Sequence, residues 1–217
     1  ITPFDIVSFC KDLYGLFSDK ATRKQIHFTF HAAIDECKIW ADTEKVETIL
    51  YNLLSNAFKF TSSEGSIDLS IKQVSPDEKF TRGAVEIKVA DTGIGIAPED
   101  HEKIFARFYQ APQAKNIENG SGIGLTLAAE YIKLHHGKIT VQSELGKGAT
   151  FSIWLPLGNI HFPVTDETTS LNLLAIKTNS GKTDDEKAYL YNLDSDKPLI
   201  LIVEDNHDMI GFLRLNL

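Results

Sequence analysis

The sequence predicts an α+β fold in which helices pack on one face of a mixed β-sheet. Some segments alternate apolar and polar residues, as half-buried strands do, and others repeat apolar residues at the spacing of a helix. The two kinds of segment follow one another in mixed order along the chain. This order is typical of helices layered against a sheet.

The first predicted elements lie near the start of the chain. An apolar stripe predicts a helix over residues 4–17, and the alternation in "IHFTFHA" predicts a strand over 26–32. A second helix is predicted over 42–60, with Asp42 as its N-cap. Its buried face consists of Val46, Ile49, Leu50, Leu53, Leu54 and Ala57.

Two hairpins and two further helices follow. Residues 66–74 and 84–91 predict a pair of strands joined by a polar turn, and residues 98–110 predict a short helix with a proline in its first turn. The stretch 120–137 predicts a glycine-rich loop that runs into a helix, and 138–156 predicts a second hairpin. One face of its last strand carries Ala149, Phe151, Ile153 and Leu155.

The composition changes after Pro156. Residues 157–197 are rich in Asp, Thr, Ser, Asn and Lys, so they predict a linker. A new fold is predicted from residue 198, where an apolar strand precedes the acidic pair Glu204 and Asp205. An acidic turn after a buried strand is the alternative interpretation of that pair.

Length and charge exclude several classes of protein. The 217 residues allow one good domain plus an appendage, and the net charge of −8 argues against a nucleic-acid footprint and against attraction to a membrane surface. Cys10 and Cys37 lack metal-ligand spacing, so we expect buried thiols of a reducing compartment. Both ends of the chain interrupt predicted elements, and we expect it to be part of a longer protein.

The first candidate group is a polar stripe on the predicted helix 42–60. Asn52, Asn56 and Lys59 are spaced by four and three residues, so they share one face, opposite the apolar stripe. An amide oxygen can ligate Mg²⁺, and an ammonium group can contact phosphate oxygens. A solvated polar face is the alternative.

The second candidate group is the triplet that begins at Asp91. This carboxylate ends a predicted strand, and Gly93 and Gly95 let the backbone pass close to a ligand. A carboxylate there can accept a hydrogen bond from an exocyclic amine such as that of adenine. The aspartic-protease reading needs two such triplets, because that chemistry shares one proton between two carboxylates, and this chain has one. A simple turn is the other alternative.

The third candidate group is the glycine-rich loop before the last predicted helix. Gly120, Gly122 and Gly124 precede an amphipathic pattern that starts at Leu125. The N–H groups at a helix start bind anions, and glycines let phosphate approach. A dinucleotide fingerprint is excluded, because Leu127 stands where its third glycine would be. A merely flexible loop is the alternative, but the three groups together supply the parts of an ATP pocket.

Five motifs resemble the ATP-binding domain of two-component sensor histidine kinases. They are "NLLSNAFKFT", "DTGIGI", "IFARFYQ", "GSGIGLTLAAEYIKLHHG" and "GKGATFSIWLP", in the family's order. The resemblance spans residues 4–156. It implies the α/β sandwich of the histidine kinase, gyrase and chaperone ATPases, with ATP held between the helices and a flexible lid.

The resemblance also implies a division into domains. Residues 1–20 would be the end of an acceptor-helix domain or a connecting helix, and 21–156 would be the ATP-binding catalytic domain. Residues 157–197 would be a linker. Residues 198–217 resemble the start of a response-regulator receiver domain, which indicates a hybrid kinase.

Roles follow for individual residues. Asn56 would ligate Mg²⁺, Asn52 would lie beside it, and Lys59 would contact phosphate; these three form the implied catalytic set. Phe105 and Phe108 would anchor the lid. The implied nucleotide-binding residues are Asn56, Lys59, Phe60, Asp91, Gly93, Gly95, Ile96, Phe108, Gly120, Gly122, Gly124, Leu125 and Thr150.

The residues at two positions bear on the reaction. Relatives that hydrolyse ATP carry a glutamate base where this chain has Asn52. An amide cannot take a proton from water, so this position favours transfer of the phosphoryl group to a protein side chain over hydrolysis. Gln110 stands where many family members have an arginine after the Phe-Tyr pair. Arg107 or Lys115 could substitute for that arginine.

None of the seven histidines occupies the family's phosphoacceptor setting, a histidine followed by an acidic residue in a helix ahead of the ATP-binding domain. We therefore expect transfer of the ATP γ-phosphoryl group to a histidine on a dimerisation helix outside this chain, and then to a receiver aspartate. The expected partners are those helices, in a homodimer, and a receiver domain. No contact of this part with nucleic acid or membrane is expected.

A non-catalytic nucleotide-sensing module of the same fold is the alternative function. The substitution at Gln110 and the missing acceptor favour that alternative. In either case, the resemblance implies the cytoplasmic portion of a membrane-anchored sensor.

Overall fold

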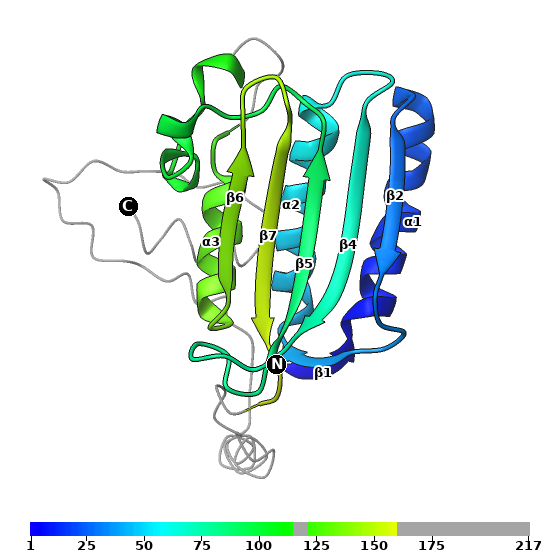
Figure 1. Cartoon of the computed structure of the whole chain (residues 1–217), viewed down its shortest axis with the longest axis vertical. Helices are drawn as coiled ribbons and strands as arrows, with labels where there is room; N and C mark the ends of the chain where they lie inside the picture. Colours follow the sequence, from blue (N-terminus) through cyan, green and yellow to red (C-terminus); the bar gives the residue numbers. More distant parts are fainter. Residues whose placement is uncertain (115–120, 160–217) are drawn as a thin grey trace, which may run out of the picture. The chain divides into compact units, whose positions relative to one another are not determined.

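The computed structural model describes residues 1–114 and 121–159. The central element of this part is a five-stranded mixed sheet (Figure 1). The strands, in spatial order, are β2 (His27–Ala32), β4 (Ser66–Val74), β5 (Ala84–Asp91), β7 (Ala149–Pro156) and β6 (Lys138–Ser143). β2 runs parallel to β4, and the other neighbours are antiparallel. Both predicted hairpins, β4–β5 and β6–β7, are confirmed.

The helices α1 (Ile6–Lys24), α2 (Thr43–Phe60) and α3 (Gly124–Leu134) cover the same face of this sheet (Figure 1). The predicted inward faces of α2 and β7 are buried. The predicted fold, α+β with helices on one face of a mixed sheet, is therefore confirmed. Within the described residues, no helix combines the length and the apolar character that a bilayer span requires.

The first residues form a short strand before the first helix. β1 (Thr2–Asp5) pairs antiparallel with β3 (Lys38–Ala41), and Asp5 caps α1 by accepting hydrogen bonds from the backbone N–H groups of Val7 and Ser8. The helix predicted over residues 4–17 therefore begins later and extends to Lys24. The ring of Phe17 stacks on Phe58 of α2 with centroids 5.3 Å apart, so α1 packs with the rest of this unit. The domain boundary at residue 20 stays a prediction.

The helix predicted over residues 98–110 does not form as one element. Two short 3₁₀ turns, Pro98–Asp100 and Lys103–Phe105, stand there instead. Within this segment, Ile104 is the one apolar side chain that is fully buried, so no apolar stripe holds a helix against the core. Phe108 has a φ of 61°, which a right-handed helix cannot continue through.

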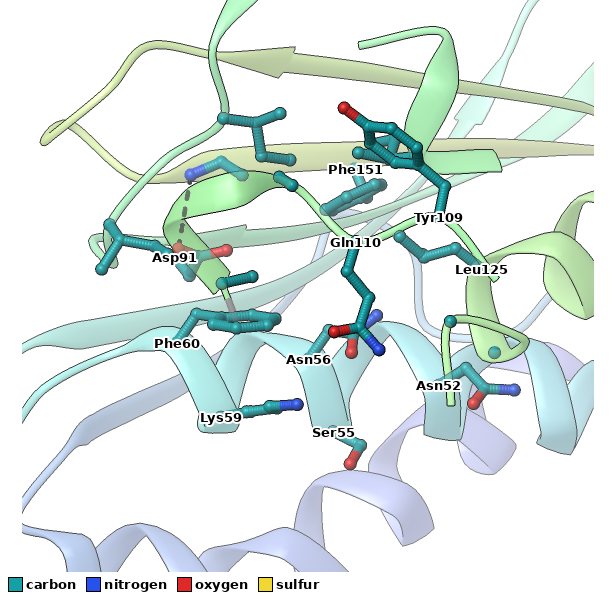
Figure 2. Close-up of a pocket in the computed structure, with 18 of the residues that line it drawn as sticks. Asn52, Ser55, Asn56, Lys59, Phe60, Asp91, Tyr109, Gln110, Leu125 and Phe151 are labelled. Carbon is teal, nitrogen blue, oxygen red and sulfur yellow. Dashed lines mark hydrogen bonds between the residues drawn. The ribbon is translucent and has the colours of Figure 1, made fainter. Parts of the chain in front are cut away.

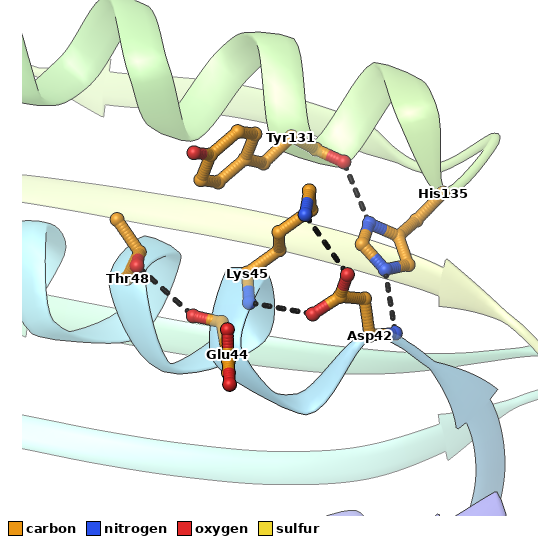
Figure 3. A network of polar contacts seen from close by, with 6 residues as sticks. All are labelled: Asp42, Glu44, Lys45, Thr48, Tyr131 and His135. Carbon is orange, nitrogen blue, oxygen red and sulfur yellow. Dashed lines mark hydrogen bonds and ion pairs between the residues drawn. The ribbon is translucent and has the colours of Figure 1, made fainter. Parts of the chain in front are cut away.

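A partly buried polar network joins the start of α2 to the end of α3 (Figure 3). His135 accepts a hydrogen bond from the Asp42 backbone N–H at Nε2 (3.0 Å), and its Nδ1 donates to the Tyr131 carbonyl (2.7 Å). The ring is therefore neutral, with one donor and one acceptor nitrogen. Lys45 forms an ion pair with the Asp42 carboxylate at 2.9 Å. These contacts fix the position of α2 relative to α3.

Three sequence predictions lie outside the described residues. They are the receiver start at 198–217, the linker from residue 160 onward, and residues 115–120 of the lid predicted over 111–122.

Candidate functional site

A cavity of about 360 Å³ lies between α2, the end of β5 and the start of α3. This volume is within the range of small-molecule pockets. Asp91 lies at one end and Asn52 at the other, with Lys59 and Asn56 between them (Figure 2). Of the predicted site residues, the cavity brings together Asn52, Asn56, Lys59, Phe60, Asp91, Gly95, Ile96, Gly122, Gly124 and Leu125.

One wall of the cavity is the polar face of α2. Asn52, Ser55, Asn56 and Lys59 follow one another at helical spacing, and all four line the cavity. The Asn52 side-chain amide donates to the Thr48 carbonyl (2.9 Å) within the same helix. The predicted shared face is therefore confirmed. It presents two amides and an ammonium group to whatever fills the cavity.

The Asp91 carboxylate is held by backbone N–H groups. Its Oδ1 accepts hydrogen bonds from Gly93 (2.8 Å) and Ala149 (3.3 Å; Figure 2). Burial raises the pKa of Asp91, and these two N–H groups act in the opposite direction. Oδ2 has no hydrogen-bond partner within residues 1–114 and 121–159, so it can accept from a ligand in the cavity.

Close contacts, with backbone at Gly95 and with a side chain at Gly124, explain two of the glycines. Gly95 has a φ of 69°, and a Cβ there would collide with the Glu144 carbonyl. A Cβ on Gly124 would lie 2.6 Å from Oδ1 of Asn52. The absence of side chains at these positions lets the loop after β5 and the start of α3 close around the cavity.

The N-terminus of α3 opens into the cavity without a side-chain cap. Its N-cap residue is Ile123, which makes no capping hydrogen bond, and Gly124 and Leu125 of the first turn line the cavity. Helix-start N–H groups that no side chain satisfies attract anions. This geometry suits a phosphate group.

The rim of the cavity includes Tyr109, Gln110, Ala111, Ala114, Ser121 and Gly122. The Tyr109 hydroxyl donates to the buried carboxylate of Asp100 (2.6 Å), and Tyr109 lines the cavity. The Phe108 N–H donates to the Gly122 carbonyl (3.0 Å), which joins a predicted anchor of the lid to the last residue of the predicted lid. Phe105 packs edge-on against Phe151 with centroids 6.5 Å apart, in keeping with its predicted anchoring position.

Three of the predicted nucleotide-binding residues that the structure describes do not line the cavity. The Phe108 ring is 70% exposed, because the positive φ of this residue turns it away. Thr150 alternates with Ala149 and Phe151, so the sheet directs it to the opposite face, which corrects its predicted place beside the ligand. Gly93 contacts Asp91 instead of the cavity, because the Gly93 N–H donates to Oδ1 of Asp91. Gly120 lies outside the described residues.

Other lining residues were not predicted from the sequence. They are Ser55, Ile94, Ile104, Tyr109, Gln110, Ala111, Ala114, Ser121, Ala149 and Phe151. The helical spacing that groups Asn52 with Asn56 also includes Ser55, and the strand alternation places Ala149 with Phe151. These two periodicities could have identified three of them.

Comparison with known families identifies the chain's relatives. The profile of the histidine kinase-, DNA gyrase B- and HSP90-like ATPases matches residues 41–159. The chain is 33% identical to histidine kinase P4 of Formosa agariphila over 97% of its own length and 16% of that protein. It is 38% identical to the sensor histidine kinase TmoS of Ectopseudomonas mendocina over 80% of its length and 18% of that protein. The chain thus spans less than a fifth of these two relatives.

Solved structures agree with this family match. The catalytic domain of histidine kinase ThkA superimposes with a TM-score of 0.61 at 26% identity, over 71% of this chain and 96% of that domain. Full-length ShkA in complex with AMPPNP gives a TM-score of 0.59 at 30% identity, over 71% of this chain and 30% of ShkA. ThkA in complex with the response regulator TrrA gives 0.59 at 25% identity, over 72% of this chain and 42% of that chain.

Proposed function

Because the chain belongs to the family of histidine kinase-, DNA gyrase B- and HSP90-like ATPases, as an ATP-binding catalytic domain of the histidine kinase type, we propose that it uses Mg²⁺-ATP to phosphorylate a histidine outside this chain. One observation carries the proposal. A single cavity brings together an acceptor carboxylate, a polar amide–ammonium face and an uncapped helix start.

Adenine would occupy the end of the cavity that contains Asp91. Oδ2 of this carboxylate would accept a hydrogen bond from the exocyclic amine, while Oδ1 stays bound to the backbone N–H groups of Gly93 and Ala149. The apolar side chains of Ile94, Ile96, Ile104 and Phe151 line the cavity and would contact the base. The AMPPNP complex of the similar kinase ShkA supports a nucleotide as the ligand.

The phosphates would lie between α2 and the start of α3. Lys59 and Asp91 are the charged residues among the described ones that line the cavity, so its walls carry no net charge. A triphosphate therefore needs a further cation, and Mg²⁺ would neutralise its charge. No cluster of three His, Cys, Asp or Glu side chains within the described residues could hold a metal. The Asn56 amide oxygen would therefore share the ion with phosphate oxygens.

The site favours phosphoryl transfer over hydrolysis. The hydrolytic relatives place a glutamate base where this chain has Asn52, whose amide donates to the Thr48 carbonyl. Asp91 is the carboxylate among the described lining residues, and we assign it to the adenine end. Catalysis would then consist of positioning and charge neutralisation of the γ-phosphoryl group for an incoming imidazole.

The wider protein would supply the remaining parts. We propose acceptor helices that dimerise the kinase, a receiver domain that begins near residue 198, and a membrane anchor elsewhere in the protein. The curated relatives are several times longer than this chain, which leaves room for such parts. The complex of ThkA with the response regulator TrrA supports a response regulator as the next partner, and we propose a receiver aspartate as the next phosphoryl acceptor.

A reconstituted transfer reaction tests this proposal. The chain is incubated with radiolabelled ATP, Mg²⁺ and the separately produced acceptor helices of a similar histidine kinase. We expect an acid-labile, alkali-stable phosphoryl label on the helices, and loss of that label with Asn56→Ala. ATP binding by the chain without any label above the chain-free control would instead favour a nucleotide-sensing module.

A further inference from the structure

The adenine end of the cavity is connected to the turn between β6 and β7 by Ser143. This serine is the last residue of β6 and lies on the helix-facing side of the sheet, in register with Ala149. Its Oγ accepts a hydrogen bond from the Ile96 N–H (2.8 Å) and donates to the Gly148 carbonyl (2.6 Å). One hydroxyl thus joins the loop after β5 to the end of the β6–β7 turn.

Two further contacts bring the same segments together. The Gly146 N–H donates to the Ile94 carbonyl (2.8 Å), and the Gly95 backbone lies against the Glu144 carbonyl. Gly148 packs equally closely on the Asp91 carbonyl, so that a Cβ at Gly148 would collide with it. The turn after β6 therefore packs against the loop that follows Asp91 and holds it in place.

Ser143 is also connected to the Asp91 carboxylate through the backbone of Gly148 and Ala149. Ala149, whose N–H donates to Oδ1 of Asp91, directly follows Gly148, whose carbonyl accepts from Ser143. Ile96 itself lines the cavity, whereas Ser143 does not. A change at Ser143 would therefore reach the adenine end of the cavity by two routes, through the Ile96 N–H and through the Gly148 carbonyl.

We propose that Ser143 is a positioning residue for adenine recognition, which holds Ile96 and the Ala149 N–H where the cavity can distinguish an aminopurine from a purine without the amine. This inference rests on the proposed nucleotide site. Removing the hydroxyl leaves the Ile96 N–H and the Gly148 carbonyl without their partner. The Gly146–Ile94 hydrogen bond still joins the loop to the turn, but the Ala149 N–H can shift away from Oδ1 of Asp91, which then relies on the Gly93 N–H for its orientation.

Calorimetry on the 217-residue chain tests this inference, with ATP and purine riboside triphosphate as ligands, the latter lacking the exocyclic amine. For Ser143→Ala we expect ATP affinity to fall by roughly tenfold and affinity for the second ligand by less than about threefold, as loss of a positioned hydrogen bond predicts. Ser143→Thr keeps a hydroxyl and should restore the preference. Thr140→Ala, on the outer face of the same strand, is the matched control.

The outcomes separate this inference from the proposed function. A parallel loss of affinity for both ligands in Ser143→Ala, or an unchanged preference, overturns the positioning role while the nucleotide site stands. If the parent chain binds neither ligand, the proposed function fails and this inference fails with it. A preference that is lost in Ser143→Ala, regained in Ser143→Thr and kept in Thr140→Ala establishes the role.

Discussion

Asp91→Asn should weaken ATP binding and stabilise the ligand-free chain at the same time. The asparagine carbonyl can still accept from the Gly93 and Ala149 N–H groups, but its NH₂ replaces the oxygen that would accept from the adenine amine. Loss of a hydrogen bond to a charged group costs about 1.5–3 kcal/mol, which corresponds to roughly 10- to 150-fold in affinity. Calorimetric titration with Mg²⁺-ATP measures this loss.

The stability effect follows from the raised pKa of Asp91. A carboxyl group whose pKa is higher in the folded state than in the unfolded state destabilises the fold once it ionises, as pH rises through the folded pKa. The neutral asparagine avoids that cost. The melting temperature of ligand-free Asp91→Asn should therefore exceed that of the parent at pH 7, and the difference should shrink as pH falls and Asp91 becomes protonated.

The matched control for this pair of measurements is Asp68→Asn. Asp68 lies on β4, where its carboxylate contacts Thr29 and His31 rather than the cavity. It should leave ATP affinity unchanged. If Asp91→Asn binds ATP within about twofold of the parent, Asp91 does not accept from the adenine amine, and if it melts at a lower temperature at pH 7, the ionised carboxylate does not destabilise the fold.

Three further predictions concern metal, pH and the glycine loop. Asn56→Ala should weaken ATP binding in Mg²⁺ but change it little in chelator, as paired titrations would show. Burial lowers the pKa of His135, so on acidification the unfolded chain takes up a proton at this residue before the folded chain does. The free energy of unfolding, measured in urea, should therefore be greatest above about pH 6.5 and decline below it. The decline should be smaller in His135→Gln. Gly124→Ala should weaken ATP binding because its Cβ meets Asn52, whereas Gly15→Ala, with nothing within 4 Å, should leave binding intact and add about 0.5–1 kcal/mol of stability.

The sequence predicted the elements whose pattern is dense. α2 combines an N-cap, a continuous apolar face and a polar face, and β4, β5 and β7 alternate clearly, so their positions match the structure. It did not reveal the pairing of β1 with β3, because that pairing joins two four-residue segments that are far apart in the chain. Local periodicity carries no information about such a contact.

The site was predictable to a similar extent. Asn52, Asn56 and Lys59 follow from helical spacing, and Asp91 follows from its place at a strand end. Ser143 gave no signal, since a single serine at the end of a strand is ordinary and its importance depends on Ile96 lying opposite in space. The exposure of Phe108 could not be foreseen either, because it depends on a positive φ in a segment whose pattern suggested a helix.

Calorimetric titration of the chain with ATP, in Mg²⁺ and again in chelator, would show whether the cavity is a Mg²⁺-ATP site. We expect saturable binding of one nucleotide per chain in Mg²⁺ and markedly lower affinity in chelator, because the described residues that line the cavity carry no net charge to offset a triphosphate. The ATP site would be contradicted by a chain that is folded by circular dichroism but gives no binding heat at millimolar ATP or ATP analogue.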